Sequence, residues 1–285
     1  MWTLPLPSNK NAIAELKTAL TYCNGKAKYE LTKEEVAAIK ELYELYEKLA
    51  GRAQQPLLGE GFTAATKAAV KEGYKEVQVK RRLAALRSRL ILASNRCPVC
   101  SISTVEDLDH HLPESVYELL AIYSSNLIPM CHKCNNKKRA VAGETPQNSF
   151  IHAYYDKVPQ DERFLTALTK IIDGALTVEF QIDRTPTLKK NVYQMLNFQC
   201  NRVLLSDRLK KEINILLTGQ AVPLEMAFGE EKDAAAVKEL LIKQDEHYTR
   251  KMGKNDWRSS LLGSLAKNEE FCAGGFIQAL GLGNA

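Results

Sequence analysis

Two short cysteine pairs, Cys97-Pro-Val-Cys100 and Cys131-His-Lys-Cys134, decide the fold of the middle of this 285-residue chain. Two cysteines separated by two residues sit on a tight knuckle, which can turn both sulfur atoms toward one ion. Four thiolates suit tetrahedral Zn²⁺. Residues 101–130 lie between the pairs, which is more than a minimal zinc ribbon contains, so a further element is inserted there. The spacing therefore predicts one structural zinc held by all four cysteines.

The rest of the composition fits a globular protein that stays in a reducing compartment. The chain is 45% hydrophobic and 26% charged, and it has seven cysteines. No stretch approaches the roughly 18 apolar residues that would cross a bilayer, and no secretory signal opens the chain, so we expect a cytoplasmic protein without membrane contact. In such a compartment paired cysteines are metal ligands rather than disulfides. The isolated Cys23, Cys200 and Cys272 are expected to be small buried hydrophobes.

The flanks of this middle segment are mainly helical in pattern. Thr32 and Glu35 form a capping box that opens a helix to about residue 50. Apolar spacing predicts further helices over 75–94, 161–176, 186–217, 233–251 and 256–267, a strand over 177–182, and loops over 54–63, 221–230 and 273–285. We therefore expect an α+β protein that is mainly α. It would have an N-terminal helical region over 1–94, a small core over 95–156 and a mostly helical C-terminal region over 157–285.

The insertion between the cysteine pairs carries a recognisable order of residues. It contains Asp-His-His-Leu-Pro at 109–113 and Asn-Leu-Ile-Pro-Met at 126–130, and Asn-Asn-Lys-Lys follows the second pair at 135–138. This order resembles the HNH endonucleases, in their zinc-bearing form, over about residues 97–139. The resemblance implies a ββα-metal core, in which two strands and a helix surround one catalytic divalent ion.

The resemblance also assigns a role to each residue of the core. His110 corresponds to the general base that activates a water molecule. Asp109 and Asn135 correspond to the ligands of a catalytic Mg²⁺ or Mn²⁺ ion. Asn126 corresponds to the residue that holds the loop and orients the base. The third named position of the family is often His, and Asn135 stands there, which leaves the metal preference open. His111 is the alternative base, although the family pattern places the chemistry directly after Asp109.

A second segment extends the resemblance. Phe-Ile-His-Ala-Tyr-Tyr-Asp at 150–156 is similar to a segment that follows the HNH core in one bacterial subgroup. That subgroup includes nucleases of Septu-type and retron-associated anti-phage systems, which often work beside an ATPase. The similarity implies an effector of such a system, with an ATPase or another defence subunit as its partner. His152 within this segment either packs under the core or contacts substrate.

Positive charge is concentrated next to the first cysteine pair. Between residues 75 and 96, seven Lys and Arg residues stand against Glu76 alone, a net charge of +6, whereas the whole chain sums to +5. Such a segment suits a polyanion, because each cation that pairs with a phosphate releases a condensed counterion. The alternative is a solvated helix face. The residues that we expect to contact nucleic acid are Arg82 and Arg89, which would share one helix face, with Arg96, Lys137, Lys138 and Arg139.

Together these features predict a metal-dependent HNH endonuclease that hydrolyses nucleic-acid phosphodiesters, with DNA as the expected substrate. The sequence does not discriminate DNA from RNA. The first alternative is a non-catalytic zinc ribbon that binds nucleic acid or a protein, which needs the four cysteines but not Asp109, His110 and Asn135. The second alternative is an enzyme that stays silent until a partner releases it.

Overall fold

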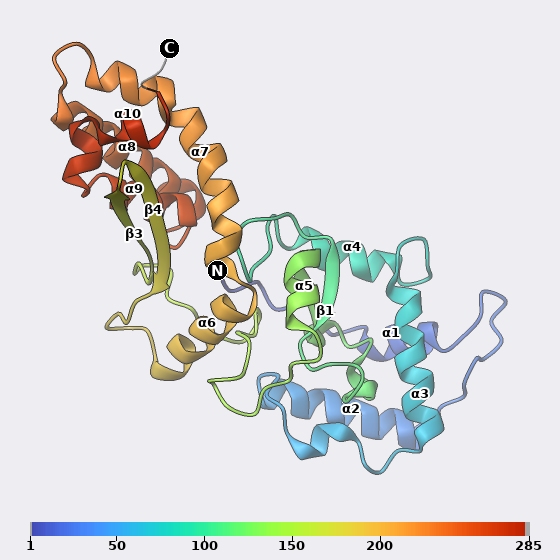
Figure 1. Cartoon of the computed structure of the whole chain (residues 1–285). Coiled ribbons are helices and arrows are strands. Elements are labelled where there is room, and N and C mark those ends of the chain that lie inside the picture. The colour runs from blue at the N-terminus through green and yellow to red at the C-terminus, as the bar shows by residue number, and fades with distance from the viewer. Residues whose placement is uncertain (1, 283–285) are drawn as a thin grey trace. The chain divides into compact units, whose positions relative to one another are not determined.

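The computed structural model describes residues 2–282, which fold into two compact units (Figure 1). The first unit runs from Trp2 to Lys157 and the second begins at Val158. Helices dominate both units, and each contains one two-stranded antiparallel sheet. The expected class, α+β and mainly α, is confirmed. No helix among the described residues is both long and apolar enough to cross a membrane.

The first unit begins with four helices. They are α1 (Ala12–Ala19), α2 (Lys33–Lys48), α3 (Ala64–Gly73) and α4 (Ala84–Leu92), with 3-10 turns η1 (Gln55–Leu58) and η2 (Tyr74–Val77). The capping box at the start of α2 is present, because the Thr32 hydroxyl accepts from the amide of Glu35 and the Glu35 carboxylate accepts from the amide of Thr32.

The long helix expected over 75–94 does not form. It is replaced by η2, a turn and the shorter α4. Gln78 has an extended backbone and Lys80 has a φ of 61°, so the helical hydrogen-bond pattern cannot continue through these residues. Arg82 therefore lies before the start of α4 and shares no helix face with Arg89.

The centre of the first unit has the expected ββα order. Strand β1 (Asp107–His110) pairs with β2 (Leu127–Met130) in an antiparallel register that places Asp109 opposite Ile128. Helix α5 (His132–Lys138) begins directly after Cys131 and packs against β1 (Figure 1). The connection between the strands is long and contains two 3-10 turns, η3 (Glu118–Leu120) and η4 (Ser124–Asn126).

The helices and the ββα element share one hydrophobic core. Leu108 and Leu127 from the two strands lie in the same buried cluster as Leu16 of α1, Tyr46 of α2 and Leu90 of α4. The regions expected separately over 1–94 and 95–156 are therefore one folding unit. The small sheet packs on the helices in this core. It depends on them, because a two-stranded sheet buries too little apolar surface to be stable alone.

The second unit contains a hairpin and five α-helices. Strands β3 (Leu165–Ile172) and β4 (Ala175–Ile182) pair along their length, and the helices are α6 (Lys190–Arg202), α7 (Leu205–Phe228), α8 (Ala234–Met252), α9 (Trp257–Leu265) and α10 (Phe276–Ala279), with a π-helical turn η5 (Phe271–Gly275) before the last. The strand predicted over 177–182 and the helices predicted near α8 and α9 are present.

Further expectations for secondary structure or burial are also wrong. The helix predicted over 161–176 is strand β3, which turns into β4 through Asp173 and Gly174, both with positive φ. The loop predicted over 221–230 is the last part of α7. The helix continues past Pro223, where burial of Leu224 and Phe228 offsets the lost backbone hydrogen bond. Cys23, expected to be buried, is exposed.

Candidate zinc site and catalytic cleft

The four paired cysteines converge on one buried point. The sulfur atoms of Cys97, Cys100, Cys131 and Cys134 all lie within 4.8 Å of one another. The Cys100 and Cys131 sulfurs are 3.8 Å apart. A zinc ion with four Zn–S bonds of about 2.3 Å requires sulfur atoms about 3.8 Å apart, which is the edge of the tetrahedron. The donor set and its spacing therefore fit a structural Zn²⁺ ion.

Polar side chains of β1 and α5 face one another beside this zinc site. Asp107 and Asp109 alternate along β1 and so share one face of the strand. His132, Asn135 and Lys138 are three residues apart on α5 and share one face of the helix. The Asn135 amide donates to Asp107 Oδ2 at 3.1 Å, His132 Nδ1 lies 3.1 Å from the same oxygen, and Lys138 Nζ lies 2.9 Å from Asp109 Oδ2.

An open cleft of about 490 Å³ lies along this contact. Asp109, His110 and Asn135, which the sequence assigns to the chemistry, all line it. The other lining residues are Tyr74, Gln78, Arg87, Asp107, Leu108, Pro113, Glu114, Ser115, His132, Arg139 and Ala140. The sequence patterns assigned no role in this cleft to Asp107 and His132. Their spacing from Asp109 and Asn135, two and three residues, was the signal that could have placed them in the cleft.

His110 is held in one orientation. Its Nε2 lies 2.8 Å from the carbonyl oxygen of Ala121. A carbonyl can only accept, so Nε2 carries the hydrogen and Nδ1 keeps the lone pair. Burial lowers the pKa of His110 to about 4, against a smaller opposing effect of the Ala121 hydrogen bond. The ring is therefore neutral at pH 7, with Nδ1 as the basic atom.

Asn126 secures the loop between the strands. It is fully buried, and its Oδ1 accepts from the Leu112 amide at 2.8 Å. Its Nδ2 donates to the carbonyl oxygens of Leu112 at 3.0 Å and Leu120 at 3.2 Å. The second carbonyl belongs to the residue before Ala121, which holds His110. Asn126 thus acts on the loop and does not line the cleft.

His111 lies away from the cleft. Its ring is buried, with its centroid 4.1 Å from that of His152. Burial holds the pKa of His111 well below its ordinary value. Of these two neighbouring histidines, only His110 lines the cleft.

Two of the arginines expected on nucleic acid make contacts within the protein. The Arg82 guanidinium donates to the Thr18 carbonyl at 2.7 Å and to the hydroxyl and carbonyl of Thr21. Arg89 pairs with Glu15 at 3.0 Å. The prediction that Arg82 and Arg89 share one helix face is therefore wrong, because Arg82 lies outside α4.

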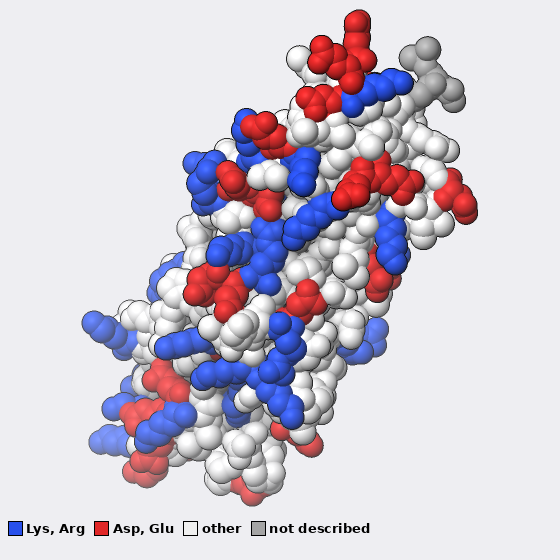
Figure 2. Space-filling view, turned by 90° about the vertical axis from the view of Figure 1, so that its left-hand side faces the viewer, with Lys and Arg blue, Asp and Glu red and all other residues white. Residues whose placement is uncertain are grey.

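The other expected cations differ in exposure. Lys138 is 1% exposed, so it is an internal cation and the prediction that it contacts phosphate is wrong. Arg96 is half-buried beside Cys97. Lys137 and Arg139 are exposed, and Arg139 lines the cleft. On the face of the described residues drawn in Figure 2, basic and acidic side chains are interspersed.

Arg139 also has an unusual backbone. It follows the last residue of α5 with φ 54° and ψ −147°. That combination is nearly confined to glycine, because a Cβ atom crowds the neighbouring peptide groups there. A large cationic side chain in this conformation at the edge of the cleft is a strained feature.

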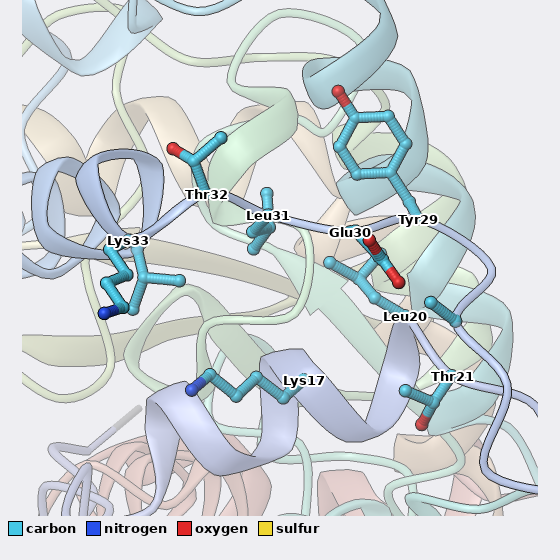
Figure 3. A pocket seen from close by; sticks show the side chains of 10 residues that line it. Lys17, Leu20, Thr21, Tyr29, Glu30, Leu31, Thr32 and Lys33 are labelled. Atoms are coloured by element: carbon cyan, nitrogen blue, oxygen red, sulfur yellow. The ribbon is translucent and has the colours of Figure 1, made fainter.

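A second hollow lies in the helical part of the first unit (Figure 3). It measures about 440 Å³ and lies between α1 and the segment that leads into α2. Lys17, Leu20, Tyr29 and Leu31 are among its lining side chains. It shares no residue with the cleft of Asp109 and His110.

Comparisons with known proteins give one partial similarity. No family model matches the chain. No solved structure matches it. Protein ea31 of Escherichia phage lambda is 33% identical over 70 residues, which is 24% of this chain and 24% of that protein. The chain thus aligns with about a quarter of the length of this relative.

Proposed function

We propose that the protein is a metal-dependent HNH endonuclease that hydrolyses phosphodiester bonds of nucleic acid, with DNA as its substrate. The observation that carries this proposal is the common cleft of Asp109, His110 and Asn135. These residues come from a strand and from a helix, and a zinc ribbon that only binds has no need to bring them together.

The donor set supports a catalytic Mg²⁺ or Mn²⁺ ion. Asp109 is 5% exposed, and its Oδ2 is paired with Lys138 Nζ at 2.9 Å. Carboxylate and amide oxygens are the ligands that a hard cation prefers. Asp109 and the amide oxygen of Asn135 would hold the ion, and Asp107 adds a further carboxylate to the same face. When bound, such an ion neutralises charge on the phosphate and on the leaving oxygen.

His110 supplies the base. Its Nδ1 takes a proton from a water molecule, and the resulting hydroxide attacks phosphorus as the bond to the 3′ oxygen breaks. The Ala121 carbonyl fixes the tautomer that this step requires. Because burial keeps the ring neutral at pH 7, the base is available without prior deprotonation.

Exposed cations at the cleft would bind the phosphate backbone. Arg139 lines the cleft, and Lys137 is exposed on the same helix end. These contacts carry no sequence information, and they make binding sensitive to salt. The place of the enzyme in an anti-phage system and an ATPase partner are proposed from the resemblance over 150–156. A cytoplasmic location is proposed because paired metal-binding cysteines suit a reducing compartment.

The test is a plasmid-cleavage assay with Mg²⁺, with Mn²⁺ or with EDTA. We expect the wild type to cleave with a divalent ion and His110→Ala to lose cleavage while it keeps its zinc and its fold. Cleavage that survives in His110→Ala would contradict the assignment of the base. Nucleic-acid binding with no cleavage in any metal would favour the non-catalytic zinc ribbon.

A further inference from the structure

His152 is a fully buried histidine outside the cleft. Its Nδ1 accepts a hydrogen bond from the Tyr154 amide at 3.2 Å, so that nitrogen carries no hydrogen. Burial, with Arg52 and Lys138 nearby, holds the pKa of His152 well below its ordinary value, so the ring is neutral. Nε2 therefore carries the single ring hydrogen.

The direction of the next hydrogen bonds follows from that tautomer. His152 Nε2 lies 2.9 Å from the Tyr46 hydroxyl and donates to it. The hydroxyl keeps its own hydrogen and donates it to Asn126 Oδ1 at 3.1 Å, which is nearer than the Ser125 carbonyl oxygen at 3.4 Å. Tyr46 is fully buried on α2, so no water competes for this contact.

Asn126 connects Tyr46 to the loop between β1 and β2. Its Oδ1 accepts from both Tyr46 and the Leu112 amide. If the Asn126 side chain rotated by 180°, its NH₂ group would face these two donors, so the observed orientation is fixed. Its Nδ2 ties the Leu120 carbonyl, and the following carbonyl, of Ala121, accepts from His110 Nε2. A continuous path of hydrogen bonds and one peptide unit thus joins His152 to His110.

The backbone of the first unit is adapted to this path. Gly51 has a φ of +70°, and a Cβ atom there would lie 2.3 Å from His152 Cδ2 and 2.9 Å from the Tyr46 hydroxyl. Asp156, paired with Arg52, accepts from the His152 amide at 2.7 Å. Gly51 and Arg52 therefore hold His152 and Asp156 next to Tyr46.

We propose that His152 is a positioning residue, which acts through Tyr46 and Asn126 to fix the loop that holds His110 in its reactive orientation. The proposal rests on the nuclease function proposed above. It excludes substrate contact for His152, because the ring is fully buried.

The test compares two tyrosines of the same helix. Tyr46→Phe removes the bridging hydroxyl and keeps the ring. Tyr43→Phe removes a buried hydroxyl whose contact, to the Leu119 carbonyl at 3.4 Å, does not reach Asn126. The readouts are the tautomer of His110, from ¹⁵N NMR of the ring nitrogens, and kcat and KM for cleavage.

We expect Tyr46→Phe to mix or broaden the His110 ring signals and to lower kcat by about tenfold, a part of the roughly 10²–10⁴-fold that a positioned base contributes. Its KM and zinc content should match those of Tyr43→Phe. A Tyr46→Phe protein with unchanged His110 signals overturns the proposal, whatever its activity. If the wild type cleaves nothing and the His110 signals still change, the positioning role stands and the nuclease proposal fails.

A second pair of variants probes the same path by steric contact. Gly51→Ala and Gly25→Ala impose similar left-handed strain, at φ +70° and +80°, but a Cβ at Gly25 meets nothing within 4 Å. We expect only Gly51→Ala to disturb the His110 signals. Equal His110 spectra for the two variants would contradict the proposal.

Discussion

The ammonium group of Lys138 lies 2.9 Å from Asp109 Oδ2, and both side chains are buried. The same ammonium donates to the carbonyl oxygen of His110 at 2.7 Å. One internal cation thus ties two consecutive residues of β1 to the end of α5. Burial raises the pKa of Asp109 from its ordinary value to about 6, and the nearby Lys138 ammonium opposes this shift.

Removing this cation should destabilise the protein strongly. Lys138→Met would leave the Asp109 carboxylate buried without its partner, and breaking a buried ion pair costs about 3–5 kcal/mol. Lys137→Met, one residue earlier and exposed, should change the free energy of unfolding by less than about 0.5 kcal/mol. Urea unfolding of both variants measures the difference, and equal values would show that the Lys138–Asp109 pair is not buried in solution.

Zinc removal should unfold the first unit. Metal binding energy is also folding energy where the ligands come from separate segments. Purified protein should carry about one zinc per chain, and Cys97→Ser should lower both the zinc content and the melting temperature. Cys23→Ser, at an exposed and isolated cysteine, is the control. A zinc-free protein that melts like the wild type would contradict this prediction.

Arg139→Gly should have opposite effects on stability and binding. Glycine relieves the strained backbone at this position, which we expect to raise the free energy of unfolding by about 1 kcal/mol. Loss of the guanidinium should weaken nucleic-acid binding for all sequences alike and reduce the log–log salt slope by about one. Arg139→Lys keeps both the charge and the strain and serves as the control. Salt titrations with unchanged slope in Arg139→Gly would exclude a phosphate contact.

The stability of the protein should fall in mild acid partly because of His152. Its pKa is lowered in the folded state and returns to about 6.5 in the unfolded chain, so below that pH only the unfolded state takes up the proton. His152 makes its full contribution to the free energy of unfolding above about pH 6.5. Below that pH the contribution falls by about 1.4 kcal/mol per pH unit. His152→Gln should flatten the pH dependence of unfolding by that amount. His247→Gln, at an exposed position, should leave it unchanged.

The local order of the ββα element was more predictable from sequence than the contacts of single side chains around it. Asp109, His110 and Asn135 share one cleft because a short strand and a short helix flank two zinc knuckles, and local spacing encodes all of that. The sequence predicted phosphate contacts for Lys138 and Arg82, but the two cations bind a carboxylate and backbone carbonyls of the protein itself. A charge pattern does not show which cations make such internal contacts.

The errors in secondary structure have local causes. Residues 165–172 are apolar enough to suit a helix or a strand, and the Asp173-Gly174 turn, which favours a hairpin, decided between them. Pro223 predicted a loop, yet packing of Leu224 and Phe228 keeps α7 intact. In the first case the turn, and in the second case tertiary packing, outweighed the secondary-structure propensity of the segment.

The shared core of the first unit makes the ββα element unsuitable as a portable module. Leu108 and Leu127 are buried against side chains of α1, α2 and α4, so a fragment that starts at residue 95 would expose the apolar side of its own sheet. Truncations and gene fusions that keep each unit whole should divide the chain near the junction of Lys157 and Val158 instead. The helices before residue 95 thus belong to the smallest part that can fold, and any engineered transplant of the cleft must carry them along.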